Sequence, residues 1–290
     1  MAYPTVSGPY GFVPVNAFGG RQFAGSTRMV PIVNAYGTGL YNGDPIAIGT
    51  GANIGCAVTT GLTYNQSAIA NGQIGIFVGC EYSATGGPIY GKNRYQYWKA
   101  STAATDAVAY VVDDPWALFK VCVLNGGSGN TSTLQYVNQA YVGANVYYVP
   151  GAGGSQTTGN SGAGVAITTA ATSTSAITPA TTANAPFRIV QIVPETAVNV
   201  VQSCTSNSTT LTIPSSGTNS AILPGMAVNG PGITVGSNTY VTTVNGSTIT
   251  VNTAVATNQA TATNFTFTGY PEVIVGWNFG HHAYLNGTGV

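Results

Sequence analysis

Val-Thr-Thr-Val-Asn-Gly-Ser-Thr-Ile-Thr-Val, residues 241–251, is the stretch of sequence that most directly decides the fold. Its dipeptide Asn245–Gly246 separates two β-branched runs, residues 240–244 and 248–252. Asn and Gly tolerate the positive φ angles of a type I′ turn, and the twist of that turn matches the twist of the flanking strands. Over residues 248–251 Thr alternates with Ile and Val, so one face of the strand is apolar and the other carries hydroxyl groups. The stretch therefore predicts a β-hairpin.

Short runs of the same kind recur along the chain, separated by Gly, Asn, Pro or Asp. Strands are expected at 29–33, 45–48, 74–78, 107–112, 118–124, 145–149, 187–193 and 272–277. Gly (39 residues) and Tyr (17 residues) are frequent, whereas the good helix formers Glu, Lys, Arg, Gln and Leu are scarce. This pattern predicts an all-β fold, with an antiparallel barrel or sandwich as the body of the protein.

The hairpin belongs to a segment that we interpret as a module of its own, residues 199–268. Five short strands are expected in it, at 209–213, 226–229, 240–244, 248–252 and 264–268. That number of strands is enough for a small β-sandwich. Residues 270–277 again have the pattern of a core strand. The sequence therefore predicts a body formed by 1–198 plus 269–290, with a second, outer β module inserted near the C-terminus.

Residues 151–185 consist almost entirely of Gly, Ser, Thr and Ala. Such a run buries little apolar area, which on its own does not offset the entropy lost when the chain is ordered. Two interpretations remain open. The run is either a low-complexity surface loop or an extended arm that becomes ordered against a neighbouring subunit.

Charged residues are unusually few: seven Lys or Arg and seven Asp or Glu make up 5% of the 290 residues, against about 25% in an ordinary domain. We expect much of the surface to be covered by neighbouring subunits, or to be polar without charge. The basic residues are dispersed and the formal net charge is zero, which argues against a nucleic-acid partner. Lys92, Arg94 and Lys99 stand among Tyr and Trp residues, but a strand that presents alternate faces explains them more simply.

Compartment signals point to a protein that is made in a reducing cytoplasm. The N-terminus has neither a basic region nor an apolar run, so no signal peptide is expected. No stretch approaches 18 uninterrupted apolar residues, so no membrane partner is expected. The cysteines are far apart, which favours buried free thiols over disulfides or a zinc site. They are Cys56, Cys80, Cys122 and Cys204.

Patterns for catalysis and metal binding are weak. The two histidines, His281 and His282, are adjacent. Because neighbours in a strand point to opposite faces, these two side chains cannot easily bind the same metal ion. Paired carboxylates of the glycosidase type are represented by Asp113 and Asp114, but Asp-Asp-Pro-Trp at 113–116 is more simply a turn between two strands. The sequence therefore predicts no enzymatic activity, no cofactor and no metal site.

Several fragments of the sequence resemble a known group of viral proteins. The chain opens with Pro-Tyr-Gly-Phe-Val-Pro-Val at 9–15, continues with Gly-Gly-Arg at 19–21, and reaches Tyr-Asn-Gly-Asp-Pro-Ile at 41–46. Gly-Ile-Phe-Val-Gly-Cys at 75–80 and Tyr-Pro-Glu-Val at 270–273 follow the same pattern. These fragments resemble the capsid decoration (cement) proteins of tailed bacteriophages. The resemblance covers residues 1–198 and 269–290, and residues 199–268 depart from the shorter members.

The resemblance implies a structural virion protein on the outer surface of the phage head, made in the host cytoplasm. Its partners would be the major capsid protein and its own copies, in a homotrimer or similar oligomer, and it would stabilise the capsid by bridging neighbouring capsid subunits. The Pro- and Gly-rich segment 3–23 would then add to a neighbour's sheet edge. Two alternatives remain: a phage tail, receptor-binding or glycan-binding protein, or a bacterial surface-layer or adhesin module.

Candidate contact residues are the aromatic, basic and histidine side chains near the two ends of the chain. Arg21 and Arg28 are scarce charges and are expected either to pair with another subunit or to be ordinary solvated residues. The full set of expected subunit or capsid contacts is Tyr10, Phe12, Arg21, Phe23, Arg28, Trp277, His281 and His282.

Overall fold

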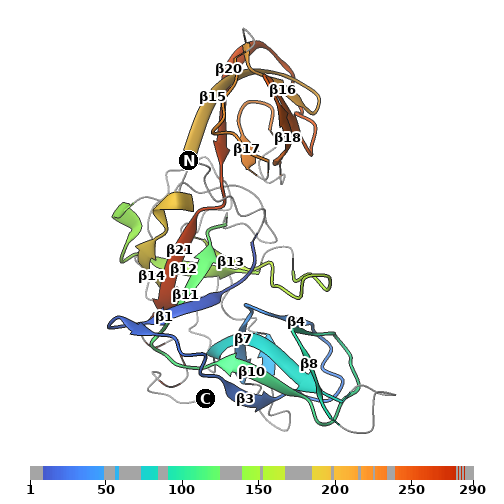
Figure 1. Ribbon diagram of the computed structural model, residues 1–290, viewed down its shortest axis with the longest axis vertical. Coiled ribbons are helices and arrows are strands. Elements are labelled where there is room, and N and C mark those ends of the chain that lie inside the picture. Colours follow the sequence, from blue (N-terminus) through green and yellow to red (C-terminus); the bar gives the residue numbers. More distant parts are fainter. Residues whose placement is uncertain are drawn as a thin grey trace.

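The computed structural model describes residues 9–48, 56–58, 73–83, 91–124, 139–150, 153–166, 185–196, 199–214, 217–224, 226–233, 239–278, 280, 282 and 284. In this part of the chain the regular structure is almost entirely antiparallel β-sheet, which confirms the all-β class (Figure 1). The described helices are two single 3-10 turns, η1 (Gln139–Tyr141) and η2 (Pro194–Thr196). None of the described helical segments has the length and apolar character needed to cross a membrane.

The centre of the body is a seven-stranded sheet with the strand order β13-β12-β14-β21-β11-β1-β2. Its strands are β1 (Val13–Ala17), β2 (Arg21–Gln22), β11 (Ala117–Cys122), β12 (Asn145–Val149), β13 (Gly164–Ala166), β14 (Phe187–Ile192) and β21 (Glu272–Trp277). Strand β21 therefore lies in the middle of the sheet, between β14 and β11, although it is the last strand in the described sequence.

A second sheet of the body has the order β3-β10-β7-β5-β6, and β8 pairs with β7 outside that path. Strands β4 and β9 form a separate two-stranded ladder. The bounds are β3 (Arg28–Pro31), β4 (Leu40–Tyr41), β5 (Pro45–Ile48), β6 (Cys56–Val58), β7 (Gln73–Tyr82), β8 (Asn93–Tyr95), β9 (Tyr97–Trp98) and β10 (Val108–Val112).

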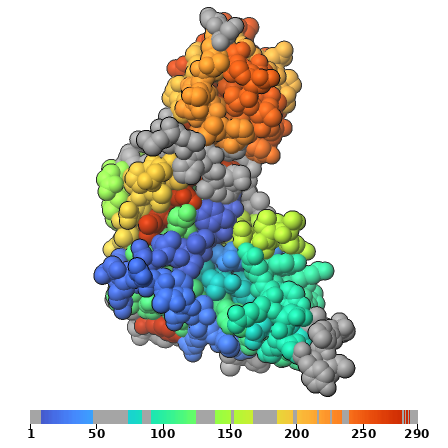
Figure 2. Space-filling view, in the orientation of Figure 1, coloured from blue at the N-terminus to red at the C-terminus, as the bar shows by residue number. Residues whose placement is uncertain are grey.

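The inserted module is one six-stranded sheet with the order β17-β20-β15-β16-β19-β18. Its strands are β15 (Asn199–Asn207), β16 (Thr210–Thr212), β17 (Ala227–Asn229), β18 (Val241–Asn245), β19 (Thr248–Val251) and β20 (Gln259–Thr268). The sheet curls until its edges meet, because Ala227, the first residue of β17, bridges to Tyr240, which precedes β18. Figures 1 and 2 show the module as a separate lobe at one end of the molecule.

The chain leaves the body for the module and returns to the body at neighbouring positions. It follows β14 and precedes β21, and these two strands are hydrogen-bonded neighbours in the body. Within the module, the first residue of β15 and the last residue of β20 are also paired, as Asn199 with Thr268. Below them, the Glu272 N–H donates to Thr196 Oγ1 at 2.8 Å. The module is therefore joined to the body by two antiparallel passages of chain that lie side by side.

The predicted hairpin is present at residues 241–251. Strands β18 and β19 pair with Asn245 opposite Thr248, and Gly246 has a φ of 59° in the turn. Ile249 and Val251 are buried while Thr248 and Thr250 are partly exposed, as the alternation predicts. The expected strands at 45–48, 145–149 and 272–277 have the observed bounds, and the others agree to within a few residues, apart from β7 and β20, which are longer than expected.

The longest strand that was not expected from the sequence is β15. Its sequence, Asn-Val-Val-Gln-Ser-Cys-Thr-Ser-Asn, is mostly polar and lacks a clear alternation. It forms a long ladder with β20, and Cys204 and Ser206 are its buried side chains. Pairing with a partner some 60 residues away in sequence, and not local β-propensity, therefore decides this strand.

Each part of the protein has its own apolar core. The seven-stranded sheet packs around Phe12, Phe119, Phe187 and Val275, all of them fully buried. The second sheet has a separate cluster that includes Phe77 and Trp98. The module's cluster comes from all its strands and includes Leu211, Met226, Val228, Val241, Ile249, Phe265 and Phe267.

Two fragments on which the viral resemblance rests, residues 9–15 and 41–46, lie against each other. The Phe12 N–H donates to the Gly43 carbonyl at 3.0 Å. A Cβ atom on Gly11 would lie 2.8 Å from the Gly43 Cα, so the two backbones approach more closely than side chains allow. The Pro-aromatic-Gly element is therefore folded onto its own chain here, where Phe12 enters the core.

The described part of the low-complexity run, residues 153–166, differs from the expected loop or arm. Its strand β13 pairs with β12, and Asn160 forms a parallel bridge to Asn42. Small residues permit this close packing, because a Cβ on Gly164 would lie 2.5 Å from Leu124 Cγ. Residues 153–166 therefore belong to the body; residues 167–184 lie outside the described residues.

Asp44 ties this run to the rest of the body. Its carboxylate is 7% exposed and accepts hydrogen bonds from the Ser161 hydroxyl and from the Tyr41 N–H at 2.8 Å. Burial raises the pKa of Asp44 to about 6, although both hydrogen bonds act in the opposite direction. The folded state therefore binds this proton more tightly than the unfolded chain does, so the contribution of Asp44 to stability falls as the pH rises from 3.8 to about 6.

We expect Asp44→Asn to remove this contribution. The free energy of unfolding of the variant minus that of wild type should be about 2 kcal/mol higher at pH 7.5 than at pH 4.5. The reason is that wild type loses the contribution of Asp44 between these two pH values. Urea titrations at the two pH values measure the difference. Asp106→Asn is the control, because hydrogen bonds from Ser83 lower the pKa of Asp106 below 3.8, so its contribution changes only at lower pH and its removal leaves the difference between pH 4.5 and 7.5 unchanged. An unchanged pH dependence in Asp44→Asn contradicts the assignment.

We also expect the body to fold without the module. Paired residues of an antiparallel ladder are about 5 Å apart, so Gly-Ser-Gly in place of residues 199–268 spans the gap between the two passages of chain. The shortened protein should be monodisperse and unfold cooperatively in circular dichroism, because its two body clusters are intact. Replacement of the exposed turn residues Asn245–Gly246 by Asp-Gly is the control for a change within the module. Aggregation of the shortened body would show that the module is part of its core.

Candidate contact site

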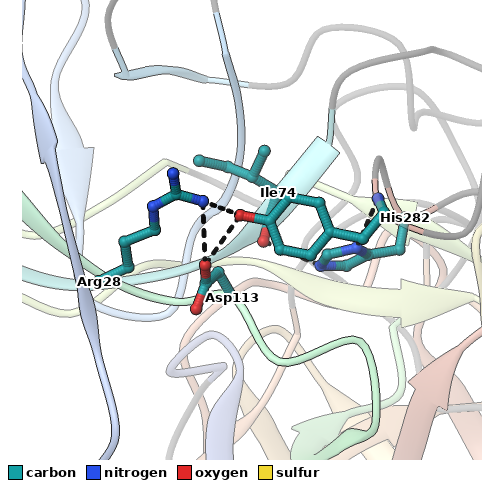
Figure 3. A network of polar contacts seen from close by, with 5 residues as sticks. Arg28, Ile74, Asp113 and His282 are labelled. Carbon is teal, nitrogen blue, oxygen red and sulfur yellow. Dashed lines mark hydrogen bonds and ion pairs between the residues drawn. The ribbon is translucent and has the colours of Figure 1, made fainter. Parts of the chain in front are cut away.

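A network of polar contacts joins the two sheets of the body near the end of the chain (Figure 3). Arg28 on β3 and Tyr284 both bind the carboxylate of Asp113, at 3.5 Å from Arg28 Nη1 and 2.9 Å from the Tyr284 hydroxyl. Arg28 also donates to the Tyr284 hydroxyl. The Arg28 side chain is 57% exposed, so its salt bridge is screened by water and contributes little stability.

His282 anchors the inner end of this network. It is fully buried, and its ring meets the Trp277 ring edge-to-face at a centroid distance of 5.3 Å. Its Nε2 lies 2.9 Å from the Ile74 carbonyl on β7, and its Nδ1 accepts the Tyr284 N–H at 3.3 Å. Burial lowers the pKa of His282. Both ring nitrogens are thus occupied by the fold, so this histidine acts as a neutral clamp between β21 and β7.

An open groove lies at one end of the seven-stranded sheet, with a cavity volume of about 360 Å³. Four strands, β1, β11, β14 and β21, contribute to it at the end that faces away from the module. Phe18 follows β1, Trp116 precedes β11, Arg188 stands near the start of β14, and Trp277 ends β21. The remaining lining residues are Pro115, Val142, Gly143, Ile189, Val190 and Asn278.

Trp116 gives the groove an exposed aromatic surface. It follows the Asp-Asp-Pro turn that the sequence predicts, and its backbone N–H donates to Asp114 Oδ1 at 2.8 Å. The indole is 49% exposed and is met edge-on by Phe18 at a centroid distance of 6.2 Å. Val142, in the same lining, is 36% exposed. Exposed apolar side chains that gather in one hollow are typical of contact surfaces.

Arg188 places a fixed positive charge beside these apolar groups. Its Nε donates to Asn145 Oδ1 at 3.0 Å, and its Nη2 donates to Asn278 Oδ1 at 3.1 Å. Both acceptors are neutral amides. In the described ranges, no carboxylate oxygen lies within 4.0 Å of the guanidinium nitrogens.

Three of the residues expected to contact other subunits are buried, and for two of them, Phe12 and His282, this corrects the assignment. Phe12 is fully buried among Phe119, Tyr148 and Phe187. Trp277 is 6% exposed and His282 is fully buried. The side chains of Phe12 and His282 therefore build the core, whereas the small exposed part of Trp277 lies in the lining of the groove.

The other expected contact residues lie in different places. Tyr10 is half-buried and donates its hydroxyl to Glu272, which Lys120 Nζ also approaches at 3.4 Å. Phe23 packs against the core of the seven-stranded sheet. Arg21 is exposed on the edge strand β2, and Arg28 is exposed in the network described above. His281 lies outside the described residues.

The sequence alone did not reveal the groove, because its parts are far apart along the chain. Trp116 stands at a predicted turn, Arg188 is one of several dispersed charges, and Phe18 and Val142 belong to no motif. No local signal could have joined these four, since the pairing of β1, β11, β21, β14 and β12 brings the ends of these strands together.

Other chemistry is sparse in the described part of the chain, where no three His, Cys, Asp or Glu side chains gather as a metal site would require. Cys80, Cys122 and Cys204 are free and buried, as expected, and burial raises the pKa of each thiol. Comparison of the chain with protein-family models, with curated proteins and with solved structures finds no match.

We expect His282→Ala to lower the free energy of unfolding by about 3 kcal/mol at pH 7.5, because it leaves a cavity and an unpaired Ile74 carbonyl. The loss should be smaller at pH 5. The lowered pKa of His282 means that wild type itself loses the stability contributed by the neutral ring as the pH falls below 6.5. Urea unfolding at both pH values measures the two losses.

Tyr284→Phe is the matched control for the network. It removes only an exposed hydroxyl and should cost less than about 1 kcal/mol. An equal loss for Tyr284→Phe, or a His282→Ala loss independent of pH, would refute the clamp.

Proposed function

We propose that this chain is a structural virion protein that seats on the outer surface of a phage head and stabilises the capsid by bridging neighbouring capsid subunits. In this proposal its partners are the major capsid protein and further copies of the chain in a trimer or similar oligomer. The resemblance of residues 9–15, 41–46, 75–80 and 270–273 to decoration proteins supports the proposal. The protein then works by binding and not by catalysis.

The observation that carries the proposal is the opposed placement of groove and module. Arg188 and Trp277 line the groove at one end of β14 and β21. The module is inserted at the other end of the same two strands, between Ile192 and Glu272. A strand of six residues is about 20 Å long, so the two features face opposite ways across the sheet. A protein that is seated by its groove end holds its module away from the support.

The charge distribution also suits a protein that works in a lattice. With 5% charged residues, the chain has little electrostatic repulsion to keep its copies apart. The edges of both body sheets end in short strands, β2 and β3, and Met29 on β3 is 60% exposed. A sheet edge can accept a strand from a neighbour. Many such weak contacts, repeated around a symmetric oligomer, give strong binding to a shell.

A receptor-binding or glycan-binding protein of a phage tail is the second candidate, and one observation favours it. The exposed Trp116 indole stands beside the fixed guanidinium of Arg188, an arrangement that also suits a sugar with an acidic group. Binding of glycans by the purified chain, without binding to capsids, would favour this candidate.

Capsids that lack the protein provide the test of the proposal. Mixed with them, the chain should bind until its sites are saturated and should raise the temperature at which the shell disrupts. Light scattering of the chain alone measures the oligomer, which we expect to be a trimer. The variant without residues 199–268 should bind as well as the full chain, because the module faces away from the shell. If the full chain leaves the temperature of shell disruption unchanged, the proposal is refuted.

A further inference from the structure

The groove combines features that indicate the chemistry of its occupant. Its volume, about 360 Å³, is in the range of sites for small ligands and short peptide segments. Trp116 lies exposed in it, and the edge-to-face contact with Phe18 holds the indole in place. An aromatic surface that is fixed before binding loses little side-chain entropy when a partner covers it.

Arg188 supplies the polar half of the site. Two neutral amides, from Asn145 and Asn278, fix the guanidinium through Nε and Nη2. In the described part of the chain its Nη1 has no hydrogen-bond partner, and no carboxylate neutralises the charge. A guanidinium that is oriented in this way and lacks an anion is complementary to a carboxylate, which it can bind with charge-assisted hydrogen bonds.

We propose that the groove binds a segment of a partner protein in which an apolar side chain stands next to a carboxylate. The apolar side chain lies on Trp116 and Val142, and the carboxylate binds Arg188. This inference rests on the proposed function, because the segment belongs to the outer face of the capsid subunit. It adds the chemistry by which that surface is recognised.

The lining favours such a peptide segment over an acidic sugar. A sugar brings several hydroxyl groups, and each of them loses its water when it enters a groove. Among the lining residues only Arg188 and Asn278 have polar side chains apart from the two indoles, and the others are Phe, Pro, Val, Ile, Gly and Trp. An apolar side chain beside one carboxylate therefore matches the lining better than a ring of hydroxyls.

Binding of short peptides to the full chain tests the inference directly. The probe is Gly-Phe-Glu-Gly with blocked ends, and its matched control is Gly-Phe-Gln-Gly; ligand-observed NMR titration measures both. We expect the Glu peptide to bind with a millimolar Kd and the Gln peptide about tenfold more weakly. Glucuronic acid is the third probe and should not compete. Equal binding of the two peptides, or binding of glucuronic acid in place of them, overturns the inference.

Variants locate the interaction in the groove. Trp116→Ala and Arg188→Gln should each weaken the Glu peptide about tenfold or more. Lys99→Gln and Val201→Ala, which remove an exposed charge and an exposed apolar side chain elsewhere, should leave the affinity unchanged. Arg188→Glu should reverse the preference toward Gly-Phe-Lys-Gly. Should Arg188→Gln not fold, Arg188→Lys retains the charge and must retain the preference for Glu over Gln.

Capsid binding by the same variants separates this inference from the proposed function. If wild type, Trp116→Ala and Arg188→Gln bind capsids equally well, the groove is refuted as the contact, and the proposed function stands. If wild type binds the Glu peptide but does not bind capsids, the proposed function is refuted. The inference that the groove binds an apolar side chain next to a carboxylate then stands. Loss of capsid binding in both variants, with the two controls intact, supports both.

Discussion

The pairing of β21 with two neighbours is the interaction on which the rest of the structure depends. Its residues bond to β14 on one side and to β11 on the other, so it occupies the middle of the main sheet. Val273 and Val275 are fully buried, and the burial of two such side chains contributes about 3–6 kcal/mol. Because β21 follows the module in the sequence, the body is complete only when the chain has passed through the module and returned. This constraint fixes the module at one end of the sheet and the groove at the other.

Polar groups in the interior hold the layers of the body in register. Asp44 and Ser161 connect the Gly- and Ser-rich segment to the loop before β5, and His282 connects β21 to the second sheet. A third cluster, Tyr10 with Glu272 and Lys120, lies at the start of β21, close to the base of the module. Each of these groups is buried or half-buried and satisfied, so the loss of one partner leaves a costly unpaired group. The scarcity of charge in the sequence therefore does not mean that polar interactions are unimportant inside the protein.

The sequence was sufficient for the fold class, for most strands and for the hairpin at 241–251, since each depends on local alternation and turn chemistry. It was insufficient for β15, whose polar residues become a strand only through β20. It also misplaced Phe12 and His282, which are fully buried. Alternation shows that a strand has two faces but not what covers them, and here other strands cover both. The groove was beyond reach for the same reason: Trp116 and Arg188 are 72 positions apart and meet only because β11, β21 and β14 are neighbours.

The attachment of the module at one end of β14 and β21 has a mechanical consequence. A load applied to the module, while the opposite end is held, pulls along the axes of these strands. Hydrogen bonds between antiparallel strands run perpendicular to the strands, so this load shears the β11–β21 ladder instead of peeling it open. Five residue pairs, from Leu118 with Gly276 to Cys122 with Glu272, then resist together. A pull across the sheet would break them one after another, so the direction in which the module is pulled decides how much force the body withstands.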